Sequence, residues 1–332
     1  MWFIQIIFLL QMISIPLEDA GQILPPRQAA LGLGGADYRY HEIRTIDQSK
    51  RADGYWIFLP AEPMTEKANL ILFNHGYGAY NPMIYGAWIK HLVRKGNVVI
   101  YPRYQKNLFW PWPSAFAKNA AKGIRNAIKV LETQPGMPKL AMDQVLMIGH
   151  SYGGVVSANL AIHAQKFGIP KVGGLMLCAP GTGPFTGGLL EEYSGMPADV
   201  KMVMIINKND HIVSPEFQFM LFETAKNVQK KQLLLQRPDF HGTYPVTASH
   251  SECYAIDLDF DSGHRTPSAY RALGMGQADV VDYNVYWRIA DGLLQDLKYP
   301  EAKSAVFGGH PEQLSLGKWS DGSPIVPLMQ LK

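Results

Sequence analysis

Apolar runs alternate with amphipathic segments along most of this sequence. Continuous apolar runs such as residues 69–74 are typical of strands that are buried on both faces of a sheet. The pattern predicts strands over residues 38–46, 54–59, 69–74, 97–101, 144–148, 172–177, 200–206 and 232–235. It predicts helices over residues 84–95, 114–132, 153–167, 215–230 and 282–297. This alternation predicts an α/β fold, with a mostly parallel sheet of about eight strands and helices on both faces.

The length and composition suit one large folded unit. The chain has 332 residues, of which 47% are hydrophobic, so it can bury a large core. No linker long enough to divide it is visible, and we predict one domain over residues 36–300 with a C-terminal tail over 301–332. Two long segments near residues 103–118 and 181–197 are expected to form cap-like loops beside a site.

The N-terminal residues 1–20 form a separate sequence feature. An apolar run from Trp2 to Ile15 ends at Pro16, and this length suits a signal peptide better than a membrane span. Two features oppose this interpretation: no Lys or Arg precedes the run, and residues 18–20 make a poor cleavage site. We predict a signal peptide, a secreted or periplasmic protein and no stable membrane span, with a membrane-tethered N-terminus as the alternative.

Charge and cysteine content restrict the function classes. The formal net charge is +3 and the chain has no basic run, so no nucleic-acid partner is expected. The two cysteines, Cys178 and Cys253, could form one disulfide in an oxidising compartment, but two cysteines do not define a disulfide framework.

The most informative motif follows the apolar run at residues 145–148. Gly149-His150-Ser151-Tyr152-Gly153 matches the G-x-S-x-G pattern, with a predicted strand before it and a predicted helix after it. In that context the pattern is a nucleophile elbow, a sharp turn that exposes a serine hydroxyl above the strand. We therefore predict that Ser151 is a nucleophile.

Polar residues with complementary chemistry follow other predicted strands. Asp210 follows the strand at 200–206, and His241 follows the strand at 232–235. The carboxyl ends of parallel strands lie at one edge of the sheet, where such folds place their sites. The order Ser, Asp, His along the chain is the order that this fold uses for a catalytic triad.

These motifs resemble the α/β-hydrolase family. The resemblance rests on His75-Gly76-Tyr77-Gly78-Ala79, on the Gly-His-Ser-Tyr-Gly elbow and, more loosely, on Asp210-His211-Ile212-Val213. Together they are similar to cutinase-like and dienelactone-hydrolase-like esterases, and the resemblance extends over most of the chain. It implies an α/β-hydrolase fold and a serine hydrolase that needs no cofactor and no metal.

The expected chemistry assigns a role to each residue. A serine hydroxyl is a poor nucleophile until a base takes its proton. We expect His241 to be that base and Asp210 to orient its imidazole. The backbone N–H groups of Tyr77 and Tyr152 are expected to form the oxyanion hole.

Two alternatives concern this triad. His250 also follows the last predicted strand and is the alternative base. Asp239 is a rival to Asp210, but it lies beside His241, and we expect it to orient a loop instead.

An aromatic cluster and an acidic loop allow further interpretations. Trp110 and Trp112 lie in a proline-rich loop beyond the strand at 97–101, where they would line a substrate pocket or form a buried plug. The acidic loop 257–263 resembles a calcium loop only partly, because its glycine falls one place late and Ser268 replaces the final Glu. We expect a polar loop and no metal there.

The sequence as a whole predicts an enzyme that hydrolyses carboxylic esters. An acyl-enzyme on Ser151 would form and then be hydrolysed, with a small-molecule or lipid-like ester of apolar or aromatic character as substrate. A lipase, a thioesterase or a peptidase would use the same triad. A catalytically inactive binding protein of the same fold is the alternative from another class.

Overall fold

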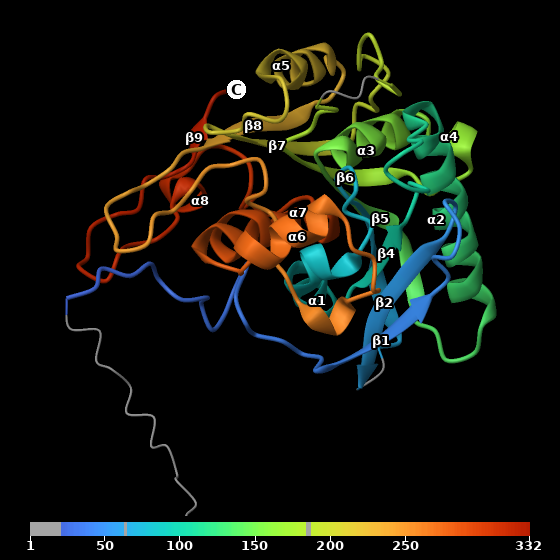
Figure 1. The fold of residues 1–332 in the computed structure, drawn as a ribbon, viewed down its shortest axis with the longest axis horizontal. Helices are drawn as coiled ribbons and strands as arrows, with labels where there is room; N and C mark the ends of the chain where they lie inside the picture. Colours follow the sequence, from blue (N-terminus) through green and yellow to red (C-terminus); the bar gives the residue numbers. More distant parts are fainter. Residues whose placement is uncertain (1–20, 63–64, 184–186) are drawn as a thin grey trace, which may run out of the picture.

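The computed structural model describes residues 21–62, 65–183 and 187–332 of the chain. The predicted signal peptide at 1–20 lies outside the described residues, as does part of the cap-like loop at 181–197. A mixed sheet of nine strands forms the centre of the fold, in the order β1-β2-β4-β3-β5-β6-β7-β8-β9 (Figure 1). The strands are β1 (Glu42–Asp47), β2 (Tyr55–Glu62), β3 (Lys67–Asn74), β4 (Val98–Pro102), β5 (Lys139–His150), β6 (Val172–Cys178), β7 (Lys201–Asn207), β8 (Lys230–Gln236) and β9 (Met329–Gln330).

The central strands confirm the prediction of a mostly parallel sheet. Neighbouring strands from β4 through β3, β5, β6 and β7 to β8 pair in parallel. The antiparallel pairs lie toward the sheet edges, between β1 and β2, between β2 and β4, and between β8 and β9. The carboxyl ends of the parallel strands therefore lie at one edge of the sheet, where loops can bring distant residues together.

Helices cover both faces of the sheet, as predicted (Figure 1). One buried cluster joins the sheet to α1, α6 and α7, and the other joins it to α2, α3 and α5. The helices are α1 (Gly86–Arg94), α2 (Phe116–Thr133), α3 (Tyr152–Ile162), α4 (Ala164–Phe167), α5 (Pro215–Thr224), α6 (Pro267–Met275), α7 (Arg288–Lys298) and α8 (Pro311–Leu314), and a π-helical segment at Asp282–Trp287 precedes α7. No helix in the described parts of the chain is long and apolar enough to cross a membrane.

Two predicted helices differ from the observed ones. The helix predicted over 215–230 ends at Thr224, because the chain must turn before β8 begins at Lys230. The helix predicted over 153–167 is interrupted at His163. The sequence pattern did not predict α6, whose first residue is a proline and whose N-cap is Thr266.

The C-terminal tail packs into the same folded unit as residues 36–300. Its strand β9 pairs with β8, and Trp319 and Leu328 are buried in the core cluster of α1 and α7. The backbone of Ser320 also donates a hydrogen bond to the carbonyl of Leu24, so the C-terminal tail lies beside the first described residues of the chain.

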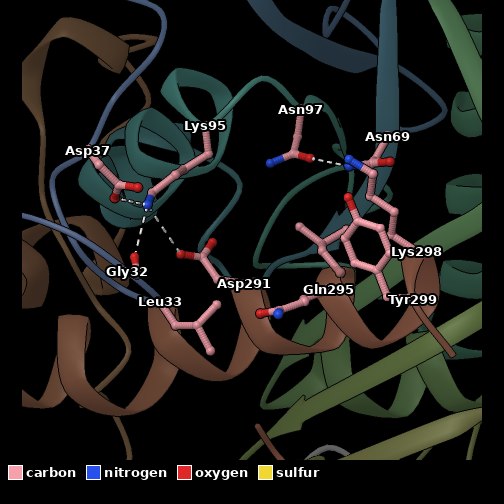
Figure 2. A pocket seen from close by; sticks show the side chains of 11 residues that line it. Gly32, Leu33, Asp37, Asn69, Lys95, Asn97, Asp291, Gln295, Lys298 and Tyr299 are labelled. Atoms are coloured by element: carbon pink, nitrogen blue, oxygen red, sulfur yellow. Dashed lines mark hydrogen bonds and ion pairs between the residues drawn. The ribbon is translucent and has the colours of Figure 1, made fainter. Parts of the chain in front are cut away.

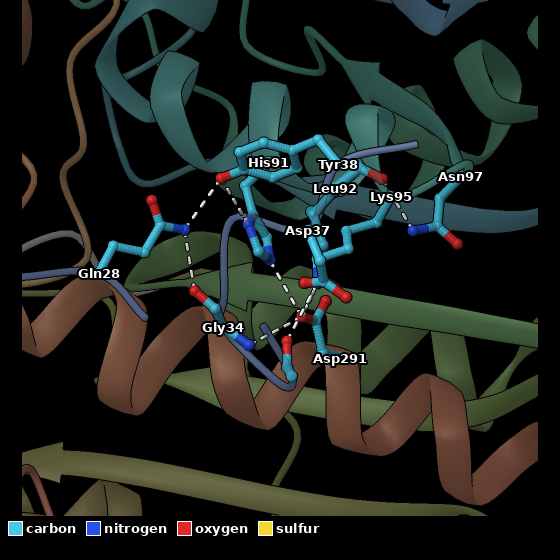
Figure 3. Close-up of polar contacts among 10 residues, drawn as sticks. Gln28, Gly34, Asp37, Tyr38, His91, Leu92, Lys95, Asn97 and Asp291 are labelled. Atoms are coloured by element: carbon cyan, nitrogen blue, oxygen red, sulfur yellow. Dashed lines mark hydrogen bonds and ion pairs between the residues drawn. The ribbon is translucent and has the colours of Figure 1, made fainter. Parts of the chain in front are cut away.

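A buried polar network fixes the segment before β1 to helices α1 and α7 (Figure 3). Nε2 of His91 lies 3.1 Å from Oδ2 of Asp291, which also accepts a hydrogen bond from the backbone N–H of Gly34. Nδ1 of His91 lies 3.1 Å from the hydroxyl of Tyr38. With Nε2 protonated and Nδ1 accepting, a neutral imidazole satisfies both contacts. The network therefore holds a structural junction away from the strand ends that carry the predicted site.

Candidate active site

Ser151 lies in a strained turn between β5 and α3. Its backbone has φ 55° and ψ −123°, an uncommon conformation for a residue with a side chain. The turn is tightly packed, because a Cβ atom on Gly153 would lie only 2.1 Å from the carbonyl oxygen of Asn74. A Cβ on Gly149 would lie 2.4 Å from the hydroxyl of Ser157. Strand, turn and helix are therefore arranged as the G-x-S-x-G pattern predicts.

Ser151 lines a small cavity at the carboxyl edge of the sheet. The cavity has a volume of about 160 Å³, and His250, His150 and Tyr254 contribute to its wall. Gly76 and Tyr77 from the loop after β3 lie on another side, and α6 contributes Pro267, Ser268 and Arg271. Segments that are far apart in the sequence thus meet around one serine hydroxyl.

Asp210 and His250 form a buried pair beside this serine. Nδ1 of His250 lies 2.7 Å from Oδ2 of Asp210, and the two side chains are only 8% and 4% exposed. His250 shares the cavity with Ser151, but no hydrogen bond joins their side chains in the described structure. Nucleophile and base are often more loosely arranged in the absence of substrate. The pair has the arrangement in which a carboxylate orients an imidazole toward a serine.

The loop after β8 explains why His250 occupies this position. Asp239 and Val246 form an isolated antiparallel bridge, so the chain leaves the strand end and then returns to it. On its return, the carbonyl of Ala248 accepts a hydrogen bond from the backbone of Asn209. The side chain of Asn207 donates a second one, of 2.7 Å, to the carbonyl of Ser249. These bonds join the returning segment to the loop that carries Asp210.

The structure does not bring His241 to Asp210, and the preferred choice of His241 as the partner of Asp210 is wrong. His241 leaves the strand end toward the surface, where its side chain is 46% exposed. Its Nε2 lies 2.7 Å from Oδ2 of Asp321 in the C-terminal tail. His250, the alternative base, is the histidine that meets Asp210.

Asp239 orients a loop, as expected from its position. Its carboxylate accepts hydrogen bonds from the backbone N–H of His241 and from Nε1 of Trp319. A third hydrogen bond comes from the backbone N–H of Val326. Asp239 therefore joins the loop after β8 to the C-terminal tail and has no contact with the cavity of Ser151.

The environment of Asp210 favours its ionised form. Burial by itself would raise the pKa of Asp210, but the hydrogen bond and charge of His250 lower it. Hydrogen bonds from the backbone N–H groups of Ile212 and Val213 lower it further, so the pKa lies below its ordinary value. The ionised carboxylate of Asp210 can therefore accept a hydrogen bond from Nδ1 of His250.

His150, inside the elbow, positions the backbone of His250. Burial, followed by the nearby His250, lowers the pKa of His150 to about 3, so its imidazole is neutral. Its Nε2 lies 2.9 Å from the carbonyl of His250 and must carry the proton, because a carbonyl only accepts. Nδ1 then accepts a hydrogen bond from the hydroxyl of Tyr85. In the sequence, the position of His150 beside Ser151 is the signal for this role.

The two tyrosines expected to supply oxyanion donors both flank the cavity. Tyr152 is the first residue of α3, so its N–H points from the N-terminal end of that helix. Tyr77 lines the cavity, and its carbonyl accepts a hydrogen bond from Ser268. The residues on either side of Tyr77 are also bonded. The N–H of Gly76 donates to the hydroxyl of Tyr85, and the N–H of Gly78 donates to Oε1 of Gln105. These bonds fix the backbone on both sides of Tyr77.

Trp110 and Trp112 lie apart from the cavity of Ser151. They line a separate groove of about 420 Å³ together with Tyr104 and Phe116. Their side chains are 77% and 73% exposed, which excludes the alternative of a buried plug. Neither ring lines the cavity of Ser151, and their assignment to the substrate pocket stays a prediction.

Other polar groups are engaged elsewhere. Lys90 pairs with Asp257 and Asp259, and Arg265 pairs with Asp261, so the acidic loop carries its own counter-charges. Within the described residues no group of three or more His, Cys, Asp or Glu side chains could hold a metal ion.

A second cavity lies beside the N-terminal segment (Figure 2). Its volume is about 360 Å³, and Lys95 and Lys298 both line it. Lys95 is bonded to Asp37 and to the carbonyl of Gly32. Asn69 donates a hydrogen bond to the neighbouring Asn97. Asn69 lies near the start of β3 and Asn97 directly precedes β4, so this cavity lies away from the carboxyl edge of the sheet that carries Ser151.

No model of a known protein family matches this chain, and no curated protein matches it either. The assignment of a function therefore depends on the geometry at Ser151, His250 and Asp210.

Proposed function

We propose that this protein is a serine hydrolase of the α/β-hydrolase fold that cleaves carboxylic esters through an acyl-enzyme on Ser151. The observation that carries the proposal is that Ser151, in a strained elbow, shares a cavity with His250, which forms a buried pair with Asp210. The mostly parallel sheet, the elbow between β5 and α3 and the chain order Ser, Asp, His support the same fold.

The proposed reaction has two acyl-transfer steps. Nε2 of His250 takes the proton of the Ser151 hydroxyl as its oxygen attacks the ester carbonyl. The tetrahedral intermediate collapses, the alcohol leaves with the proton held by His250, and the acyl group stays on Ser151. Water then attacks this acyl-enzyme, gives its proton to His250, and the carboxylic acid is released as Ser151 recovers its proton.

Two backbone groups are proposed to stabilise the oxyanion. The N–H of Tyr152 lies at the start of α3, and Tyr77 belongs to a loop fixed by the bonds of Gly76 and Gly78. Fixed donors of this kind stabilise the developing negative charge without reorganisation, and losing one typically costs about 3 kcal/mol in the transition state.

The proposed substrate is an ester with an apolar or aromatic part. The cavity at Ser151 is smaller than a typical ligand site of at least about 300 Å³. It therefore encloses only a small part of an ester, and Ile212 and Tyr254 supply apolar wall for that part. The rest of the substrate extends toward the open surface. A lipase, a thioesterase or a peptidase would use the same residues and differ in the substrate that they accept.

We propose that the protein is exported, on the apolar pattern of its first residues.

Cys178 and Cys253 are free and buried, and burial raises the pKa of both thiols, so neither acts as a nucleophile in this proposal.

Covalent labelling tests the proposal directly. An alkyl phosphonate that reacts with activated serines is expected to label the parent protein at Ser151, and Ser151→Ala is expected to abolish the label. Ser194→Ala is a control, because Ser194 does not line this cavity and its substitution is expected to leave labelling intact. An unlabelled parent protein would favour the inactive binding protein, and a label that persists in Ser151→Ala would place the nucleophile elsewhere.

A further inference from the structure

Three large aromatic side chains project from the loop between β4 and α2. Phe109, Trp110 and Trp112 are 87%, 77% and 73% exposed. Exposed apolar groups scattered singly are ordinary, but a group of adjacent large rings marks an interaction surface. We name these three residues the aromatic tip.

The backbone of the loop keeps the aromatic tip ordered while exposed. Oδ1 of Asn107 accepts hydrogen bonds from the backbone N–H groups of both Phe109 and Trp110. Pro111 and Pro113 restrict the backbone around Trp112. Because the loop is already ordered, little conformational entropy is lost when the rings are buried by a partner.

A cationic surface adjoins the aromatic tip. Lys106 lines the groove of Trp110 and Trp112, and it also lines a neighbouring cavity with Lys50 and Arg51. The carboxylate in that cavity belongs to Asp53, which already pairs with Arg51 and with Lys122 on α2. The surface beside the aromatic tip therefore carries an excess of positive charge.

The aromatic tip is connected to the cavity of Ser151. The carbonyl of Leu108, which precedes the tip, accepts a hydrogen bond from the hydroxyl of Tyr77. After the tip, Phe116 packs edge-on against Tyr152, with 5.2 Å between ring centroids. Both tyrosines flank Ser151, so a surface that holds the tip also lies near the cavity entrance.

We propose that the aromatic tip and the cations Lys50, Arg51 and Lys106 dock on an anionic lipid–water interface. Tryptophan favours such interfaces because its ring is mainly apolar and its N–H still finds water or headgroups. Each Lys or Arg near an anionic leaflet adds attraction that salt weakens. This inference concerns binding and goes beyond the proposed function, so it stands or falls independently of esterase activity.

The experiment measures partition of the full chain onto vesicles. All proteins in this experiment, including the parent, carry Ser151→Ala, so that no lipid is hydrolysed during the measurement. Vesicles of phosphatidylcholine mixed with phosphatidylglycerol are compared with vesicles of phosphatidylcholine alone, at low and high salt. Sedimentation reports binding, and quenching of tryptophan emission by brominated phosphatidylcholine reports insertion of the rings.

The expected results separate the apolar and the electrostatic contributions to vesicle binding. The double substitution Trp110→Ala and Trp112→Ala is expected to lower partition at least about tenfold and to remove the quenching. Lys106→Gln is expected to lower partition on the anionic vesicles about fivefold and to have little effect on neutral ones. Phe240→Ala and Lys298→Gln are matched controls, because both residues are exposed and lie outside the aromatic tip and its cavities.

Three results would overturn the proposal. The first is a parent protein that does not bind the anionic vesicles. The second is binding that is equal in the parent and the double Trp variant, which would place the lipid contact elsewhere in the chain. The third is self-association in the absence of lipid that the double variant loses, which would make a second copy of this chain the occupant.

Discussion

Nδ1 of His250 lies 2.7 Å from Oδ2 of Asp210, although 39 residues separate them in the sequence and another histidine is closer to the strand end. The pair is almost fully buried, whereas His241 is half exposed and bonded to Asp321. A buried imidazole beside a carboxylate has a fixed orientation, which a surface histidine lacks. This relationship makes His250 the base in the proposed reaction.

The first prediction separates the two histidines. His250→Ala is expected to lower kcat for ester hydrolysis by about 10⁴-fold or more, because no other group takes the serine proton. His241→Ala is expected to leave kcat/KM within a factor of about three, since it removes only an exposed ion pair. Steady-state kinetics on one soluble ester measures both. If His241→Ala were inactive and His250→Ala active, His241 and not His250 would be the base.

The second prediction concerns the carboxylate. Asp210→Asn is expected to lower kcat by about 10⁴-fold with little change in KM, because the amide favours the wrong tautomer of His250. Asp239→Asn is the matched control and should retain the activity of the parent, although it weakens the bonds to Trp319 and Val326. Equal activities of the two variants would exclude Asp210 from the mechanism.

The third prediction concerns the nucleophile. Ser151→Ala is expected to lower kcat by about 10⁶-fold while the unfolding midpoint stays close to that of the parent, since Ala fits the same turn. The strained backbone belongs to the elbow and not to the hydroxyl, so the fold persists without it. Activity within tenfold of the parent, about 1.4 kcal/mol in barrier, would place the nucleophile at another residue.

The fourth prediction concerns pH and His150. Its pKa falls from 6.5 to about 3 on folding, so the unfolded chain binds a proton that the folded protein does not. The effect of His150 on the free energy of unfolding is therefore most favourable above about pH 6.5. Stability is lost as the pH falls from there toward the folded pKa, because only the unfolded chain binds the proton. Between about pH 7 and about pH 5, the free energy of unfolding is expected to fall by about 2 kcal/mol through this residue.

Denaturant unfolding at the two pH values tests this dependence. His150→Gln is expected to show a smaller loss of stability on acidification than the parent, and His310→Gln, an exposed histidine variant, should behave like the parent. A pH dependence that is the same in all three proteins would contradict the prediction.

The fifth prediction concerns the stability contribution of the aromatic tip. Trp110→Ala and Trp112→Ala are each expected to change the free energy of unfolding by less than about 0.5 kcal/mol, because both rings are exposed. Trp88→Ala, in the buried core, is expected to cost about 3–5 kcal/mol. If either exposed tryptophan proves as costly as Trp88, the ring is part of the core. An ester panel on the same variants tests whether the groove also selects long or aromatic acyl groups.

The sequence alone determined the sheet, the elbow and the chemical types at the strand ends. Buried parallel strands are continuous apolar runs, and the helices between them have their own period, so local pattern is sufficient to place β3, β5 and α2. The elbow is equally local, because its glycines and Ser151 are adjacent in the chain and the tight packing at Gly153 follows from the turn itself.

The tertiary structure decided which histidine meets Asp210 and whether the tryptophans are buried. The path of the loop after β8 depends on the bridge between Asp239 and Val246 and on bonds to the loop after β7, which are contacts between distant segments. The hydrophobic pattern of the sequence carries no information on such contacts. The prediction of His241 over His250 therefore depended on its proximity to the strand end. The exposure of Trp110 and Trp112 likewise depends on whether other segments of the chain cover their loop, and this is known only from the folded structure.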